Sequence, residues 1–152
     1  MTTPVDFGIL LGLAYQTFVD ELRADLQSRG FSDVGGAFGY VFRALDQEDL
    51  NLRQLAERLG MTDQGAAKIV NDMEAGAYVE RYPDPVDGRV KKLRLARRGV
   101  AALGAARKFH QAYERRLGDQ LKLADPSNLR RLLDAIVSNS GTDAAHARLR
   151  AV

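Results

Sequence analysis

Apolar residues recur every three to four positions through most of the chain, a spacing that predicts amphipathic helices. The predicted helices cover residues 1–30, 32–46, 51–60, 62–74, 97–123 and 125 to about 141. Between the fourth and fifth of these helices, apolar and polar residues alternate over 78–82 and 91–95, as they do in half-buried strands. Pro83 and Pro85 exclude a long central strand there. We therefore expect a mainly α-helical fold with one short β-hairpin.

Capping residues mark several of the expected helix ends. Thr3 and Pro4 are typical of an N-cap followed by proline in the first turn, and Asp125-Pro126 repeats this pattern before the last helix. Asn51 and Gln54 have the spacing of a capping box. These signals fix where the first, third and last helices should begin.

The start of the helix expected over 32–46 is rich in glycine, at positions 35, 36 and 39. Each glycine inside a helix costs about 0.5–1 kcal/mol relative to alanine. Close packing against another helix or a fraying first turn is the simpler interpretation. Room for a ligand beside the aromatic residues of this helix is the alternative.

Two short helices, 51–60 and 62–74, are joined through Gly60-Met61-Thr62, with Thr62 as the N-cap of the second. The second helix has a packed apolar face, made by Ala66, Ile69, Val70 and Met73. Its opposite face should be exposed to solvent and carries Asp63, Gln64, Ala67, Lys68 and Asn71. This arrangement is typical of a helix-turn-helix, whose second helix can enter a DNA major groove. Similar helix pairs also occur in proteins that do not bind DNA.

Positive charge is concentrated after the helix-turn-helix, although the whole chain has a net charge of only +2. The cations between residues 81 and 98 are Arg81, Arg89, Lys91, Lys92, Arg94, Arg97 and Arg98. Only two acids, Asp84 and Asp87, lie in the same stretch. Such a local excess is typical of a nucleic-acid contact; a solvated surface is the alternative. A helix-turn-helix followed by a cationic hairpin predicts a winged helix.

Composition excludes several other classes of protein. The chain has no cysteine, which excludes disulfides and thiol-based switches, and its two histidines are too few to suggest a zinc site. We expect no metal and no cofactor. No apolar run approaches the roughly 18 residues of a membrane span, and no signal-peptide pattern is present, so we expect a cytoplasmic protein without a membrane partner.

An enzyme is a third class that the sequence does not favour. It has no glycine-rich phosphate loop after a strand and no nucleophile with a plausible base, so we expect no catalytic residues. Asp84 and Asp87 form a pair of carboxylates, but they lie in a loop among cations. An orienting role suits them better than acid–base chemistry.

The hairpin loop contains the most diagnostic residues of the chain. Its sequence, followed by Gly99, is Asp84-Pro85-Val86-Asp87-Gly88-Arg89-Val90-Lys91-Lys92-Leu93-Arg94-Leu95. This segment resembles the D-P-x-D-x-R-(A/V)-K-x-L-x-L-(T)-x-x-G signature of the MarR family of bacterial and archaeal transcription regulators. The order of the predicted helices agrees with that family from about Asp6 to Ser140.

The resemblance implies a homodimer that binds a pseudo-palindromic operator in double-stranded DNA. The chain would comprise an N-terminal dimerisation helix (1–30), a winged helix-turn-helix domain (31–99), C-terminal dimerisation helices (100–140) and a flexible tail (141–152). Arg89 would enter the minor groove, oriented by Asp87. The residues that we expect at the DNA interface are Arg53, Asp63, Gln64, Ala67, Lys68, Asn71, Asp87, Arg89, Lys91, Lys92 and Arg94, with Arg97 as a further phosphate contact.

Several positions depart from the family pattern. Ala96 stands where a Thr or Ser usually caps the next helix, a loss worth about 1 kcal/mol. Ala67 replaces a hydroxyl that commonly contacts DNA, and Gly65 loosens the recognition helix. The glycine usually found just before the first wing strand occurs one position early, at Gly76, so that Ala77 takes its place.

The resemblance also implies a small aromatic effector bound between the dimer helices and the winged helix. The candidate lining residues are Tyr15, Phe18, Phe38, Tyr40, Phe42, Arg43, Phe109 and Tyr113. For each aromatic residue, simple core packing is the alternative. The leading hypothesis is thus a homodimeric, sequence-specific DNA-binding transcription regulator. In its more specific form, the protein is a repressor that a small aromatic effector releases from DNA. The competing hypothesis is a winged-helix adaptor for an acidic protein partner, with weak or no DNA binding.

Overall fold

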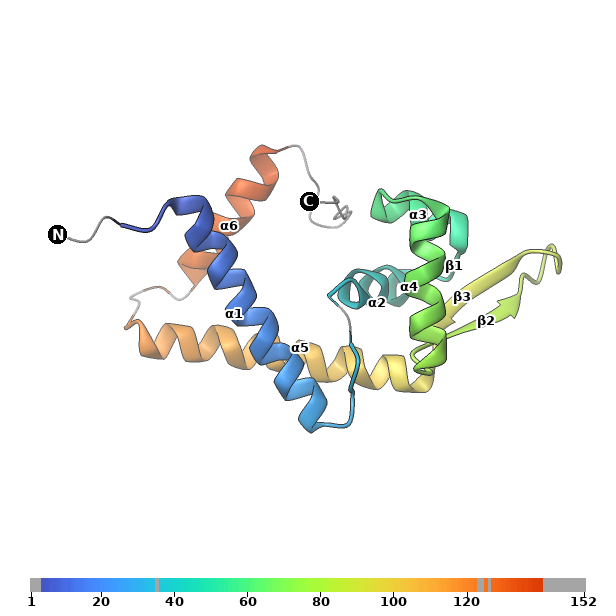
Figure 1. The fold of residues 1–152 in the computed structure, drawn as a ribbon, viewed down its shortest axis with the longest axis horizontal. Helices are drawn as coiled ribbons and strands as arrows, with labels where there is room; N and C mark the ends of the chain where they lie inside the picture. The colour runs from blue at the N-terminus through green and yellow to red at the C-terminus, as the bar shows by residue number, and fades with distance from the viewer. Residues whose placement is uncertain (1–3, 35, 123–124, 126, 141–152) are drawn as a thin grey trace.

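The computed structural model describes residues 4–34, 36–122, 125 and 127–140. Along the chain the elements are α1 (Phe7–Ser28), α2 (Phe38–Gln47), β1 (Leu50–Asn51), α3 (Leu52–Leu59), α4 (Asp63–Ala75), β2 (Val79–Pro83), β3 (Lys91–Leu95), α5 (Arg97–Gln120) and α6 (Ser127–Asn139). The expected fold class, mainly helical with a β-hairpin, is confirmed. Helices α2, α3 and α4 gather with the strands at one end of the long α5, and α1 crosses α5 near its middle (Figure 1).

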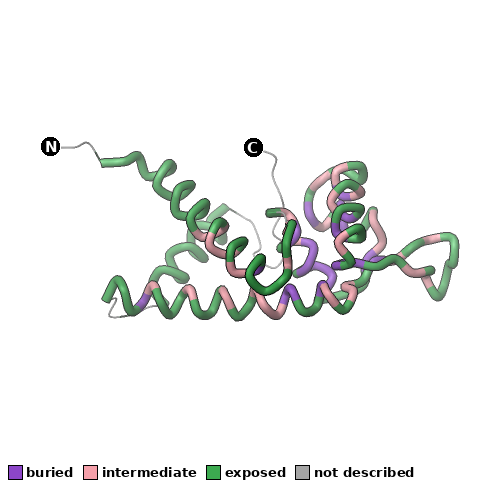
Figure 2. Tube along the Cα trace, turned by 60° about the horizontal axis from the view of Figure 1, so that its bottom comes forward, coloured by how far each residue is buried: buried purple, intermediate pink, exposed green. Residues whose placement is uncertain are grey.

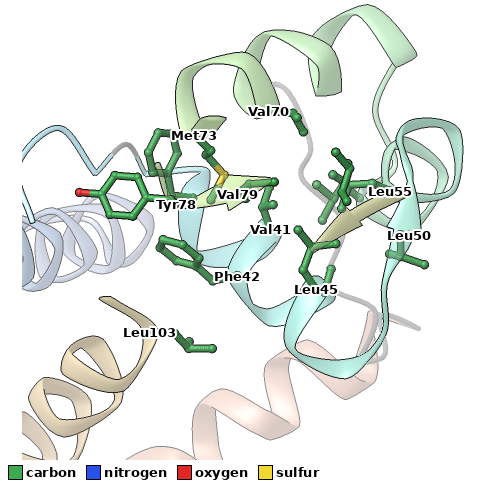
Figure 3. Close-up of a cluster of buried hydrophobic side chains, with 14 of the residues drawn as sticks. Val41, Phe42, Leu45, Leu50, Leu55, Val70, Met73, Tyr78, Val79 and Leu103 are labelled. Atoms are coloured by element: carbon green, nitrogen blue, oxygen red, sulfur yellow. The ribbon is translucent and has the colours of Figure 1, made fainter. Parts of the chain in front are cut away.

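One hydrophobic core holds the winged helix together (Figure 3). Its most deeply buried side chains come from α2, α3, α4 and the sheet, among them Val41, Leu55, Val70, Tyr78 and Leu93, each no more than 1% exposed. Burial of such side chains contributes about 1.5–3 kcal/mol each. Because α4 places its apolar face in this core, its opposite face is left in solvent.

The sheet has three antiparallel strands in the order β1-β3-β2. The two strands that the alternation predicted pair in the hairpin, with Val79 opposite Leu95 and Tyr82 opposite Lys92. The third strand, β1, was not predicted, because only Leu50 and Asn51 pair with β3 and two residues are too few to show an alternation.

The caps of the helix-turn-helix are confirmed. Asn51 Oδ1 accepts from the Gln54 amide at 2.8 Å, and Gln54 Oε1 accepts from the Asn51 amide at 3.0 Å. Gly60 ends α3 in a left-handed conformation with φ +66°. Thr62 Oγ1 then accepts from the Gly65 amide at 3.0 Å and caps α4.

Some helix boundaries were predicted wrongly. Helix α1 begins at Phe7, so Pro4 precedes it by several residues; Thr3 lies outside the described residues. Helix α2 begins at Phe38 and not at position 32, because the chain turns through Asp33 with φ +61°. Gly36 lies in the turn before α2, whereas Gly39 is the second residue of the helix, so the fraying interpretation does not apply to Gly39. Both glycines line the cavity that is described below, and position 35 lies outside the described residues.

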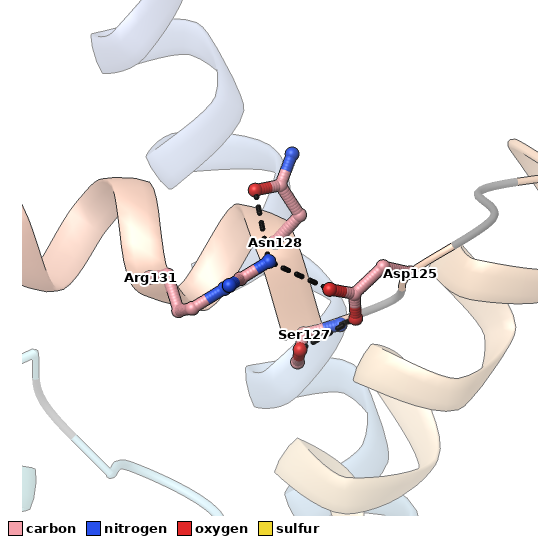
Figure 4. A network of polar contacts seen from close by, with 4 residues as sticks. All are labelled: Asp125, Ser127, Asn128 and Arg131. Carbon is pink, nitrogen blue, oxygen red and sulfur yellow. Dashed lines mark hydrogen bonds and ion pairs between the residues drawn. The ribbon is translucent and has the colours of Figure 1, made fainter.

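The C-terminal helices are also shorter than expected. Helix α5 ends at Gln120, and α6 begins at Ser127, where Asp125 Oδ1 accepts from both the amide and the hydroxyl of that serine (Figure 4). Arg131 binds the other oxygen of Asp125 at 2.6 Å. Asp125 thus caps α6 as predicted; Pro126, Gly141 and the tail 142–152 lie outside the described residues.

Helices α1 and α6 leave most of their surface in solvent (Figure 2). The exposed apolar side chains of α1 include Phe7 at 69% and Leu13 at 55%, and those of α6 include Leu132 at 57% and Ile136 at 51%. An apolar surface of this extent usually marks an interface. Among the described residues, no helix combines the length and apolar character needed to cross a bilayer.

Candidate nucleic-acid interface and adjoining cavity

The exposed face of α4 is the candidate recognition surface. Asp63, Gln64, Lys68 and Asn71 are exposed, while Ala66, Val70 and Met73 on the opposite face are at most 1% exposed. Ala67 is half-buried and so less accessible than the helical pattern predicted. The N-cap at Thr62 fixes the first turn of α4, from which Gln64 and Lys68 project on one face.

The wing loop is ordered by its own aspartates. Asp84 Oδ1 accepts from the Val86 amide at 2.8 Å, and Asp87 Oδ1 accepts from the Arg89 amide at 3.1 Å. The Arg89 guanidinium lies 3.7 Å from the same carboxylate, yet its side chain is 96% exposed. Arg89 is therefore held at the tip of the loop and can still reach a partner, the geometry that the family resemblance implies.

Arg94 in β3 is paired with an acid on the neighbouring strand. Arg94 lies 2.6 Å from Glu80 on the neighbouring strand and 4.6 Å above the ring of Tyr82. The Tyr82 hydroxyl donates to Asp49, and this hydrogen bond raises the pKa of the phenol. The hydrogen bond to Glu80 also raises the pKa of Arg94. Because Glu80 already pairs with Arg94, this arginine is a weaker candidate for a phosphate contact than the sequence indicated.

Arg81 joins the wing to α4. Its guanidinium donates to Asn71 Oδ1 at 2.7 Å and to Glu74 Oε2 at 3.2 Å. The carbonyl oxygen of Asn71 is thereby occupied, which leaves its NH2 group to donate to a phosphate. The sequence did not predict this link, because residues 71 and 81 come together only when α4 packs on β2.

Five other predicted cations differ from Arg94 because no acid pairs with them among the described residues. Within the described part of the chain, no ion pair or hydrogen bond of the side chain is found for Arg53, Lys68, Lys91, Lys92 or Arg97. Lys92 is half-buried, and the other four are exposed. Unpaired surface cations can release counterions when they meet phosphates.

A cavity of about 380 Å³ lies between α1, α2 and α5. Five of the predicted effector residues line it, namely Tyr15, Phe18, Tyr40, Phe42 and Arg43. Three others lie elsewhere. Phe38 packs in the core, 6.0 Å from Tyr78 between ring centroids, and Phe109 and Tyr113 pack against the outer side of Phe18 at 5.7 and 5.0 Å. These three side chains pack against other aromatic rings and do not line this cavity.

The cavity has polar residues that the sequence reading missed, namely Arg23, Arg107 and His110. Their spacing offered a signal, since Arg107 and His110 continue the helical stripe of Leu103 and Ala106. Arg107 is paired with Asp46 at 2.6 Å. Burial raises the pKa of the Tyr40 phenol and lowers the pKa of His110.

A helix pair with a tight turn, followed by a two-stranded wing with a cationic loop, defines the winged helix-turn-helix class. Within that class, residues 36–90 match the family model described as the MarR family. The resemblance to the MarR family is therefore confirmed over this segment, which is 55 of the 152 residues. The family is one of DNA-binding regulators and not of enzymes.

The fold of this chain is similar to that of several solved structures. The reduced form of MarR from E. coli has a TM-score of 0.70 and 19% identity, with 90% of this chain and 99% of that chain covered. YusO from Bacillus subtilis has a TM-score of 0.62 and 19% identity, with 89% and 91% covered. A mutant of MepR from S. aureus, bound to an oligodeoxyribonucleotide, has a TM-score of 0.59 and 18% identity, with 91% and 99% covered.

One curated relative is the exopolysaccharide II synthesis transcriptional activator ExpG of Rhizobium meliloti (strain 1021). It is 26% identical over 122 residues, which are 79% of this chain and 63% of that protein. The chain thus spans somewhat less than two thirds of the length of this relative.

Proposed function

We propose that the protein is a homodimeric, sequence-specific DNA-binding transcription regulator. The observation that carries this proposal is the presentation of the polar face of α4 beside an exposed arginine at the tip of the wing, Arg89. The MepR structure, which contains an oligodeoxyribonucleotide, and the activator ExpG support the same function by similarity.

Each group of side chains has a distinct role in the proposed complex. Gln64 and Lys68 would contact base edges in the major groove, where a good bidentate contact discriminates by about 1–3 kcal/mol. Arg89 would enter the minor groove, oriented by Asp87. The phosphate contacts would come from the unpaired cations Arg53, Lys91, Lys92 and Arg97 and from the NH2 group of Asn71, while Arg94 stays with Glu80. Asp63 and Ala67 would line the major groove without donating a hydrogen bond from their side chains.

A second copy of this chain is the proposed cover for the apolar surfaces of α1 and α6. Residues 1–30 and 100–140 would form the dimer, and residues 31–99 would bind one half-site. Two-fold symmetry predicts half-sites about 10 bp apart or a multiple of that distance. The wide exposure of apolar side chains on both helices supports this arrangement.

The test is to select bound fragments from the host genome and to measure their affinity by fluorescence anisotropy over a range of salt. With the four phosphate-contacting cations of each subunit, eight phosphates are neutralised per dimer, so log K should fall with log salt with a slope of about −7. K91A removes one phosphate contact per subunit and should reduce this slope by about 2, whereas K68A should relax base preference. K108A, on the exposed surface of α5 away from the wing, is the control. If no fragment is retained at low salt, the adaptor hypothesis replaces this one.

The cavity between α1, α2 and α5 is the proposed site of a small aromatic effector that carries an acid group. Aromatic side chains line it, and Arg23 and Arg43 offer cations for a carboxylate. An effector releases DNA only if it binds one conformation of the dimer better than the other. The favoured conformation must be the one in which the spacing of the two α4 helices prevents both from entering their half-sites. Titration calorimetry with salicylate, with and without DNA, tests this proposal; no heat and unchanged DNA affinity would refute it. The position of the operator relative to the promoter decides between repression and activation.

A further inference from the structure

One arginine joins the ends of two helices that are far apart in the sequence. Arg98, the second residue of α5, donates from Nη1 to the carbonyl oxygen of Gly76 at 2.6 Å and from Nη2 to that of Gly30 at 2.9 Å. Gly76 follows the last turn of α4, and Gly30 lies just beyond α1. A single guanidinium therefore connects α1, α4 and α5.

Tyr78 completes the same junction. The guanidinium of Arg98 lies 4.5 Å from the centroid of the Tyr78 ring, which is 1% exposed. The Tyr78 hydroxyl donates to the carbonyl of Ser32 at 2.9 Å, in the turn between α1 and α2. Gly76, through Arg98, and Tyr78, through its hydroxyl, are thus both tied to the turn that follows α1.

The start of α5 is pressed against the same tyrosine. The Ala96 amide donates to the Tyr78 carbonyl at 2.9 Å. A Cβ atom added to Gly99 would lie 2.0 Å from that carbonyl oxygen, so only glycine permits this approach. The backbone at the start of α5 is therefore held in place against Tyr78, which fixes the position of the Arg98 Cα atom.

The chemistry suits arginine in particular. Helix C-termini carry partial negative charge on unpaired carbonyls, which attracts a cation. Among the described residues, Arg98 has no carboxylate partner; its hydrogen bonds go to main-chain carbonyls. The planar fork of a guanidinium can bond two carbonyls at once, whereas a lysine is a single point of charge.

We propose that Arg98 is a positioning residue that fixes the orientation of α4 relative to α1 and α5. In the dimer it would thereby set the distance between the two recognition helices. The effect of Arg98 on DNA binding rests on the proposed function. Its effect on the orientation of α4 within one chain does not. Arg98 itself would not touch DNA.

The DNA test compares R98M with R97M, a matched substitution of the adjacent exposed arginine, which has no side-chain partner within the described part of the chain. R98M should lower the ratio of operator to non-specific affinity about tenfold and leave the salt slope unchanged. R97M should reduce the salt slope by about 2 and leave the ratio unchanged, as the loss of a phosphate contact does. R98M with a wild-type ratio, or with a reduced slope, would overturn the proposal.

A second measurement does not require DNA. Because the chain has no cysteine, Q64C and K108C introduce unique spin-label sites on α4 and α5. Doubly labelled chains, diluted with unlabelled protein, report the distance between the two helices within one chain. R98M should broaden this distribution but not that of an R53C/Q64C pair inside the winged helix. An unchanged α4–α5 distribution would refute the role of Arg98 even if the protein binds DNA.

The two tests separate the failure of this proposal from the failure of the proposed function. If the wild-type protein binds no operator, the regulator proposal fails, and the spin-label distances still decide the role of Arg98. If R98M does not fold, R98K retains the charge and one of the two hydrogen bonds and should show an intermediate broadening. An R98K distribution identical to the wild type would then contradict the bridging role.

Discussion

Ala77 has a backbone conformation that favours glycine, with φ +59°, in the turn between α4 and β2. A left-handed conformation costs a non-glycine residue roughly 1–2 kcal/mol, and glycine avoids this cost. Part of the gain is cancelled, because glycine has more conformational freedom in the unfolded state. We expect A77G to raise the free energy of unfolding by about 1 kcal/mol. Urea unfolding at a fixed protein concentration measures this change.

The neighbouring glycine supplies the control. Gly76 has φ −81°, so alanine is permitted there by the backbone. A Cβ atom at this position would lie 2.8 Å from two ring atoms of Tyr78, which is buried and cannot move away. G76A should therefore destabilise by about 1–3 kcal/mol. Equal effects of A77G and G76A would contradict the strain at Ala77.

Asp87 and Arg89 allow a prediction about orientation at the tip of the wing. R89A should lower operator affinity about tenfold, the loss of one good contact. D87A should lower it less, because Arg89 remains but is no longer held at 3.1 Å through its amide. If Asp87 acts through Arg89, D87A should not lower operator affinity further in the R89A background. Fluorescence anisotropy gives the operator affinities of the wild type, D87A, R89A and the double variant, which complete the double-mutant cycle. Additive losses would show an independent role for Asp87.

Local sequence predicted some residue roles and not others for a physical reason. The Asp87–Arg89 contact lies within one loop, so the motif alone located it. The pairing of Arg94 with Glu80 depends on the strand register, and that of Arg81 with Asn71 depends on how α4 packs on β2. The spacing of residues in the sequence does not predict the strand register or the packing of α4 on β2. The predicted set of cations was therefore broader than the set that the structure leaves unpaired.

At the scale of elements, α5 begins without a side-chain cap. Ala96 has the extended conformation of an N-cap, with φ −74° and ψ 168°, but cannot accept a hydrogen bond from the first turn. A96S should stabilise the protein by about 1 kcal/mol, because the serine hydroxyl can bond an unpaired amide. A101S, at an exposed interior position of the same helix, should change stability by no more than about 0.5 kcal/mol. Thermal unfolding of both variants measures the difference.

The existence of most elements followed from periodicity, whereas some of their ends did not. The caps at Asn51 and Thr62 were predicted correctly because each capping bond is local. The late start of α2 was missed because the turn at Asp33 is anchored by Tyr78, a residue more than forty positions away that donates to Ser32. The lining of the cavity was only partly predicted for the same reason, since it requires the packing of α1 on α2 and α5.

At the scale of the whole molecule, the chain has a well-packed winged helix and terminal helices that expose apolar side chains. No described residue of α6 is buried, and Leu129, Leu132, Leu133, Ile136 and Val137 all lie on its exposed surface. A periodic sequence pattern shows that such a helix has an apolar face but not whether the same chain or a second copy covers it. In this structure the same chain does not cover it, which is why we assign that face to the dimer.

This assignment predicts the effect of a single charge on assembly. I136E places a carboxylate in the proposed interface, and burying it unpaired costs about 3–5 kcal/mol, so the dimer dissociation constant should rise about 100-fold or more. S138E adds the same charge to the opposite face of α6 and should leave the dimer intact. Sedimentation velocity at micromolar concentration distinguishes these outcomes. Since the half-sites are bound together only by a dimer, I136E should also abolish operator binding while the winged helix stays folded, and a dimeric I136E protein would exclude α6 from the interface.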